Sequence, residues 1–102
     1  MFVRLVRFSV GPGNEATAQA LAEDLAPLIA QQPGCQHVTV FGDDSGECGL
    51  FVLWDSQDNA NAAAQVVRPK LDAHLPGKIQ APPDARLFRV LGSENPWANA
   101  QA

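Results

Sequence analysis

Hydrophobic and polar positions follow two periods along the chain, and together they predict four strands and two helices. Residues 2–10, 35–42, 48–55 and 86–91 are rich in β-branched and aromatic side chains, as strands are. Between these stretches, apolar residues recur at spacings of three and four, which is typical of one face of a helix. The two helical stripes consist of Ala18, Leu21, Ala22, Leu25, Leu28 and Ile29, and of Ala60, Ala63 or Ala64, Val67 and Leu71.

Turn and cap residues mark where these elements begin and end. The segment "GPG" at 11–13 ends the first strand, and Asn14 is suited to cap the helix that follows. "PG" at 33–34 ends that helix, and "DDSG" at 43–46 predicts a hairpin turn between the second and third strands. Ser56 is expected to cap the second helix.

Each predicted helix contains a proline, which removes one backbone hydrogen bond. Pro27 predicts a bend in the first helix. Pro69 predicts that the second helix breaks near Arg68 and restarts as a short turn through His74, before a loop at 75–85. The resulting order, βαββαβ, is that of an α+β ferredoxin-like fold.

Length and composition indicate one small soluble domain. The chain has 102 residues and a formal net charge of −4, and we assign 1–91 to the domain and 92–102 to a polar tail, in which Trp97 has no assigned role. The acidic balance argues against nucleic acids and anionic membrane surfaces as partners. The longest uninterrupted apolar run, 50–54, is too short to cross a bilayer. Because arginines interrupt the apolar N-terminus, we expect no signal peptide and a cytoplasmic location.

The two cysteines, Cys35 and Cys48, are predicted to lie too far apart to form a disulfide. With a hairpin turn at 43–46, Cys48 lies opposite Phe41, and Cys35 lies opposite Trp54. The thiols are then about 20 Å apart, at ~3.3 Å per residue, whereas a disulfide requires Cα atoms within about 7 Å. We therefore expect two buried free thiols and no metal site between them.

The same register divides the second and third strands into two faces. The first consists of Gln36, Val38, Val40, Phe51 and Leu53, and the second of His37, Thr39, Phe41, Leu50, Val52 and Trp54. Because helix stripes offer no partners to buried polar groups, we expect the helices to cover the first face. The second is still too apolar for water, so we predict a homodimer in which two sheets pack together. A cavity between them would have the makeup of a small-molecule pocket.

Three segments carry a resemblance to a known family: "FSVGPG" at the end of the first strand, "QQPGC" after the first helix, and "LFVLWDSQDNANAA". In these segments the chain resembles the antibiotic biosynthesis monooxygenase-like domains of the dimeric α/β-barrel superfamily, over residues 2 to about 91. The resemblance implies a homodimeric α/β barrel with a cavity between sheet and helices. It also implies one of two activities: oxidation of quinols or polyketide-like aromatics by O2 without a cofactor, or haem degradation.

The chain departs from that family at its functional positions. Many members have a histidine nine residues after the tryptophan that ends the strand, and that position here is Ala63. The three residues of the haem-degrading members fall on Val6, Ala63 and Ala73, next to His74. We therefore do not expect haem degradation, and no complete catalytic set of the cofactor-free oxygenases can be mapped.

Four residues are candidates for a site. His37 is the candidate catalytic base, because imidazole changes charge near neutral pH, or else it is hydrogen-bonded within the dimer interface. Thr39 is a candidate hydrogen-bond donor, and Trp54 either stacks on an aromatic ligand or ends its strand in the core. Arg4 shares its side of the strand with Val6, so it either binds an anion or enolate in the cavity or lies in solvent.

We expect a small cofactor-independent monooxygenase that acts on an aromatic, quinol-type compound, with no cofactor and no metal ion. In this hypothesis His37 deprotonates the phenol, and the anion reacts with O2 in a water-poor cavity. The alternative is a non-catalytic dimeric barrel that binds a small apolar ligand or a protein partner, as stress-responsive barrel proteins do. A third hypothesis is a small-acid isomerase in which Arg4 anchors the anion.

Overall fold

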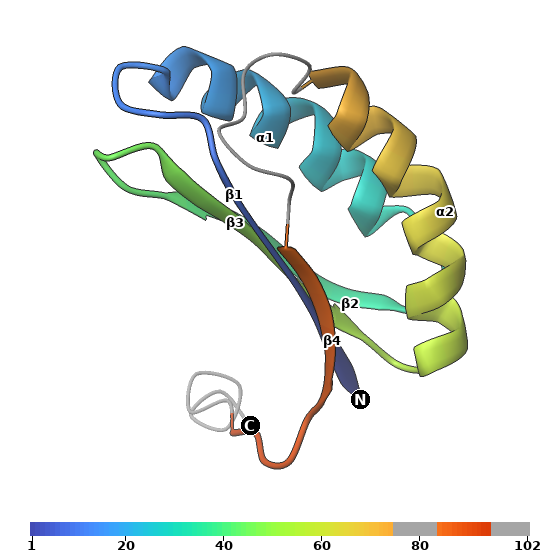
Figure 1. The fold of residues 1–102 in the computed structure, drawn as a ribbon. Coiled ribbons are helices and arrows are strands. Elements are labelled where there is room, and N and C mark those ends of the chain that lie inside the picture. The colour runs from blue at the N-terminus through green and yellow to red at the C-terminus, as the bar shows by residue number, and fades with distance from the viewer. Residues whose placement is uncertain (75–83, 95–102) are drawn as a thin grey trace, which may run out of the picture.

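The computed structural model describes residues 1–74 and 84–94, and within them the chain forms four strands and two helices (Figure 1). Most of the predicted loop at 75–85 and most of the tail, with Trp97, lie outside the described residues. The elements in chain order are β1 (Phe2–Ser9), α1 (Glu15–Ala30), β2 (Cys35–Gly42), β3 (Glu47–Trp54), α2 (Gln57–His74) and β4 (Asp84–Arg89).

The four strands form one sheet in the order β2-β3-β1-β4, and every neighbouring pair is antiparallel. Both helices lie on the same face of this sheet, side by side (Figure 1). This arrangement confirms the predicted ferredoxin-like fold. Within the described residues, neither helix is long and apolar enough to cross a membrane.

The faces of β2 are as predicted, with Val38 and Val40 toward the helices. The faces of β3 are exchanged, because the hairpin between the two strands has a shorter loop than "DDSG" suggested. Asp43 donates its backbone N–H to the carbonyl of Glu47 at 3.0 Å, so three residues form the loop, the last being Gly46 at φ 86°. A type I turn that ends in a left-handed glycine is a common three-residue hairpin loop. The pairing register is therefore one residue away from the predicted one along most of β2.

At the far end of the hairpin, a bulge at Gln36 brings the strands back into the predicted register. Cys35 lies opposite Trp54 as predicted, yet His37 already lies opposite Leu53. A shift of one residue moves every side chain of a strand to the other face. The helix-covered face consists of Val38, Val40, Leu50, Val52 and Trp54, and the other face, here called the open face, includes His37, Thr39, Phe41, Phe51 and Leu53.

The hydrophobic core lies between the helix-covered face and the two helices. Leu21, Leu25 and Ile29 contribute the buried side of α1, at the spacing that the sequence indicated. The sheet contributes Val6, Phe8, Leu50, Val52 and Trp54, and α2 contributes Ala60, Ala63 and Leu71. Most of the buried residues of α2 are therefore small, whereas those of α1 are large.

The predicted break at Pro69 is also wrong, since α2 continues through it to His74. Pro69 is exposed, and Leu71 just beyond it is buried. Continuing the helix keeps Leu71 against the core, which offsets the one backbone bond that the proline removes. The predicted cap of α2 is confirmed, because the backbone N–H of Asn59 donates to the Ser56 hydroxyl at 3.2 Å.

A short network ties the end of β3 to the turn before β2. The backbone N–H of Asp55 donates to the carbonyl of Gly34 at 2.9 Å. The Asn59 side chain donates to the Asp55 carboxylate at 2.9 Å. These bonds hold the last residue of β3, Trp54, in a defined position between sheet and helix. Both thiols are free, with Cys35 near this end and Cys48 near the hairpin.

Candidate active site

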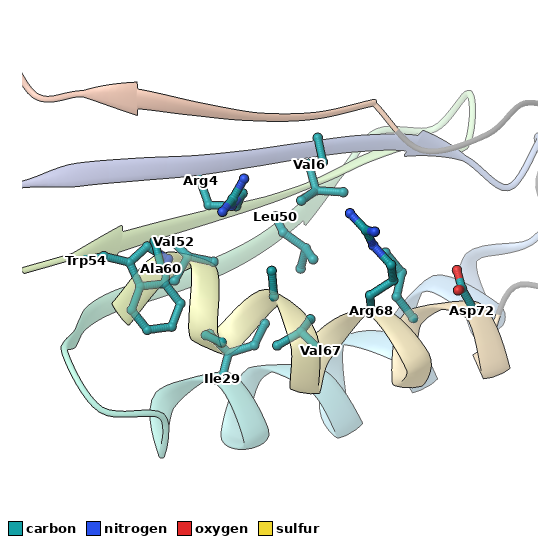
Figure 2. A pocket seen from close by; sticks show the side chains of 14 residues that line it. Arg4, Val6, Ile29, Leu50, Val52, Trp54, Ala60, Val67, Arg68 and Asp72 are labelled. Carbon is teal, nitrogen blue, oxygen red and sulfur yellow. The ribbon is translucent and has the colours of Figure 1, made fainter. Parts of the chain in front are cut away.

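A cavity of about 210 Å³ lies between the helix-covered face of the sheet and α2 (Figure 2). Its walls come from every element except β2. They comprise Arg4, Val6, Ile29, Leu50, Val52, Trp54, Ala60, Ala63, Ala64, Val67, Arg68, Leu71, Asp72 and Ala85. Most of this lining is apolar, and the charged groups that residues 1–74 and 84–94 bring to it are two arginines and one aspartate.

The cavity exists because α2 turns small side chains toward the sheet. Ala60, Ala63 and Ala64 line the cavity from α2, and residues of β1 and β3 line it from the sheet. Larger residues at these positions would fill the space, because protein interiors otherwise pack without voids of this size. The alanines of the apolar stripe of α2 therefore also leave room for the cavity.

Trp54 forms one wall of the cavity and is 2% exposed. Its indole Nε1 is buried and has no hydrogen-bond partner among the described residues. A buried tryptophan N–H usually finds an acceptor. The cavity therefore borders a donor that the described part of the protein leaves unsatisfied.

Arg4 projects from β1 into the same space (Figure 2), beside its cross-strand neighbour Val52. Its Nη2 donates to the side-chain oxygen of Asn61 at 3.0 Å, and its buried Nε has no partner among the described residues. Burial lowers the pKa of this guanidinium, and the positive charge of Arg68 lowers that pKa further. Arginine nevertheless stays protonated in proteins, so Arg4 brings a positive charge to the cavity.

Arg68 reaches the cavity from α2, one turn after Ala64 and one turn before Leu71 (Figure 2). Its guanidinium is directed toward the sheet, on the side of Arg4. Among the described residues, neither arginine forms an ion pair; the pair that is formed, between Arg7 and Glu47 at 3.1 Å, is exposed. Two like charges therefore meet at the cavity, Arg4 partly buried and Arg68 exposed, without a counterion from the described chain.

The structure separates the four residues predicted for the site. Arg4 and Trp54 line the cavity, whereas His37 and Thr39 lie on the open face. The His37 ring is within 2.5 Å of the Thr39 hydroxyl and meets the ring of Phe51 edge-on, with centroids 6.3 Å apart. The prediction that His37 and Trp54 share one face is wrong, because it relied on the four-residue hairpin loop.

Three polar residues of the site were missed by the sequence interpretation: Asn61, Arg68 and Asp72. Arg68 stands at helical spacing from Ala64 and Leu71, within the stripe that was assigned to the core. That spacing was the available signal. Arg68 was expected at the surface near the end of the helix; it is exposed, and its side chain also reaches the cavity.

Comparison with known proteins identifies the family. Residues 1–66 match the family model described as antibiotic biosynthesis monooxygenase. The chain belongs to this family. The match covers β1, α1, β2, β3 and the first part of α2, which together carry most of the cavity. No curated protein sequence matches the chain.

Solved structures of similar fold include a cofactor-independent oxygenase, SnoaB, from Streptomyces nogalater. It is 20% identical, with 90% of this chain and 94% of that chain covered and a TM-score of 0.73. A Nitrosomonas europaea protein of unknown function is 19% identical, with 93% of each chain covered and a TM-score of 0.80. A Mycobacterium tuberculosis protein is 16% identical, with 92% and 98% covered and a TM-score of 0.74. At these identities the likeness shows a shared fold.

Proposed function

We propose that this member of the family is a cofactor-independent monooxygenase that oxidises a small aromatic compound of quinol type with O2. The observation that carries the proposal is the guanidinium of Arg4, which enters an apolar cavity beside Trp54 with its Nε unpartnered among the described residues. A cationic donor in a water-poor, aromatic-walled space is suited to stabilise an aromatic oxyanion. SnoaB, which shares the fold, is a cofactor-independent oxygenase.

The size of the cavity restricts the substrate. An apolar cavity of about 150 Å³ is sufficient to hold benzene, and the cavity here measures about 210 Å³. A compound of one or two rings fits this space. The tryptophan wall and the small alanine side chains provide flat, apolar contact for such rings.

The chemistry begins with loss of a proton from the substrate. A phenol has a pKa of about 10 in water, and an opposite charge within about 4–6 Å lowers such a pKa by about 1–3. Arg4 and Arg68 supply that charge, and the Asp72 carboxylate at the cavity is the group that accepts the proton. His37 belongs to the open face, so we assign it to the dimer interface instead.

The anion then reacts with O2 without any external reductant. A ring carbon that carries two hydrogens in the keto tautomer gives its electrons to O2 and forms a carbon–oxygen bond. One oxygen atom becomes a carbonyl, the other leaves as water, and both hydrogens of the carbon end in that water. The substrate supplies all the electrons, so the product is the corresponding quinone-type ketone.

The protein acts as a homodimer in this proposal. Large apolar side chains lie exposed on the open face, with Phe41 at 46%, Phe51 at 37% and Phe88 at 46% exposure. Such a concentration of exposed aromatic area is unusual for a monomer. A second copy that packs its own open face there removes this area from water.

The proposed function is tested by O2 uptake with chelator-treated protein and a panel of one- and two-ring quinol-type compounds. We expect uptake of one O2 per carbonyl formed. Arg4→Gln is expected to lower the rate by about 10²-fold or more, the usual cost of removing one oxyanion donor. Lys70→Gln, which removes an exposed positive charge from α2, is the control and should leave the rate unchanged.

A second candidate function is supported by the absence of histidine from the described lining of the cavity. In that case the protein binds a small apolar ligand without turning it over. Saturable binding of the panel compounds with no O2 uptake above the buffer rate would reject the monooxygenase and support the binding protein.

A further inference from the structure

The cavity contains more positive charge than a single phenolate needs. Among the described residues its charged groups are Arg4, Arg68 and Asp72, and the Arg68 guanidinium is directed toward Arg4, away from Asp72 (Figure 2). Keeping two unpaired arginines next to each other is unfavourable, because like charges repel more strongly where water is partly excluded. A ligand with a formal negative charge of its own would remove this cost.

Hydrogen-bond donors at the cavity are also left over. Asn61 accepts a hydrogen bond from Arg4 Nη2 at 3.0 Å, which fixes the orientation of the guanidinium. Arg4 Nε and Trp54 Nε1 are buried and have no partner among the described residues. The two side chains are diagonal neighbours on the helix-covered face, since Arg4 pairs with Val52 and Trp54 follows two residues later. Both donor atoms are closed off from water within this wall. An acceptor with more than one oxygen that presses against the wall would satisfy both.

A carboxylate matches this set of groups. It has two oxygens in a plane, and each can accept from the flat edge of a guanidinium or from an indole N–H. Arginine also binds phosphate, but a phosphate group has no flat apolar part to occupy the rest of the cavity. The rest of the wall, with Val52, Ala60 and Ala63, suits an aromatic ring.

We propose that the site is specific for aromatic carboxylic acids, with the carboxylate held by Arg4, Arg68 and the indole N–H of Trp54. That such an acid is the substrate rests on the proposed function, so the compound oxidised is a hydroxylated aromatic acid. That the acid binds does not depend on its oxidation. The sequence had suggested that Arg4 anchors the anion of a small acid. In this proposal Arg4 has that role in binding the substrate.

Binding of a matched pair of probes tests the proposal. The probes are 4-hydroxybenzoate and its neutral analogue 4-hydroxybenzamide, measured by isothermal titration and by tryptophan fluorescence at pH 7. Trp97→Phe serves as the background, because it leaves Trp54 as the single tryptophan of the chain. We expect the acid to bind at least about tenfold more tightly than the amide, as for hydrogen bonds to a charged group.

Variants assign the preference to named groups. Arg68→Gln is expected to weaken binding of the acid several-fold while leaving binding of the amide unaffected, and Lys70→Gln should change neither affinity. Trp54→Phe keeps an aromatic ring and removes the N–H, so it should lower the affinity for the acid several-fold more than the affinity for the amide. Circular dichroism confirms that each variant is folded, and the Arg68 variant alone decides the proposal if Trp54→Phe unfolds.

Three outcomes would overturn the proposal: equal affinity for acid and amide, an equal loss in Lys70→Gln, or inorganic phosphate competing as strongly as the acid. The proposed function is judged separately, by O2 uptake. Selective binding of the acid without any turnover of hydroxylated acids rejects the monooxygenase and keeps the carboxylate site. Turnover of neutral quinols with no preference for acids rejects the carboxylate site and keeps the monooxygenase.

Discussion

Arg4 occupies a position at which the other residues on its side of β1 are apolar. Its neighbours there are Phe2, Val6 and Phe8, of which the last two are buried in the core. Burial lowers the pKa of the guanidinium because a charged group loses water there, and the neighbouring Arg68 adds to the cost. Unlike most structural arginines, it has no carboxylate partner among the described residues. A ligand is the natural counterpart of such a group.

Gly34 is the residue at which we expect the sharpest loss of stability. It has φ 83°, and a Cβ there would overlap the Asp55 carboxylate and lie 2.8 Å from Asn59 Cβ. Gly34→Ala is therefore expected to lower the free energy of unfolding by about 3 kcal/mol, at the upper end of the cost of backbone strain. Urea unfolding followed by circular dichroism measures the change.

Gly13→Ala provides the matched control for this prediction. Gly13 has a similar φ of 81°, but a Cβ there would meet nothing within 4 Å. It should therefore cost only the backbone strain, about 1 kcal/mol. Equal destabilisation by the two variants would show that overlap of a Cβ at residue 34 with Asp55 and Asn59 adds nothing to the loss of stability.

At the scale of elements, the sequence predicted every helix and strand, because the apolar periods of 2 and 3.6 are strong signals. It failed where one residue decides the outcome. The loop of the β2–β3 hairpin has three residues instead of four, and Gln36 forms a bulge, so the predicted faces of β3 were exchanged. Neither the loop length nor the bulge can be predicted from hydrophobic periodicity, because both depend on the backbone conformation at and near the turn.

The turn of this hairpin makes stability depend on the Asp43 carboxylate. Asp43 accepts hydrogen bonds from the hydroxyl of Ser45 at 2.6 Å and from the backbone N–H groups of Ser45 and Glu47 at 2.9 and 3.2 Å. The Ser45 hydroxyl first, and then the backbone bonds, lower its pKa below 3.8. A depressed pKa in the folded state means that the contribution is present above pH 3.8 and is lost as the pH falls through the folded value.

We therefore expect Asp43→Asn to be less stable than the original protein at pH 7, with a difference that shrinks below about pH 4. Urea midpoints measured from pH 7 down to pH 3 provide the test. Asp44→Asn, which leaves the bonds of Asp43 in place, is the control and should show no such convergence. A pH-independent difference for Asp43→Asn would mean that its charge contributes nothing to the turn.

At the scale of the whole molecule, the exchanged faces explain which site residues could be foreseen. Arg4 and Trp54 were singled out from their own strands, and both line the cavity. His37 and Thr39 lie on the face that the helices leave open, as predicted. The register of the hairpin had placed Trp54 with them, and it lies on the helix-covered face instead. Arg68 and Asp72 became visible only when α2 proved continuous through Pro69, because a helix brings residues one turn apart to the same wall.

The open face gives the last prediction, which concerns assembly. Phe51 lies near its middle, paired with Leu5 on one side and Thr39 on the other, and is 37% exposed. If two copies pack there, Phe51→Arg inserts two charges into the interface and should yield monomers in sedimentation at micromolar concentration. Val66→Arg alters an apolar residue on α2 that is 44% exposed and should leave the dimer intact. A monomeric original protein, or dissociation by both substitutions alike, would reject the sheet-to-sheet dimer.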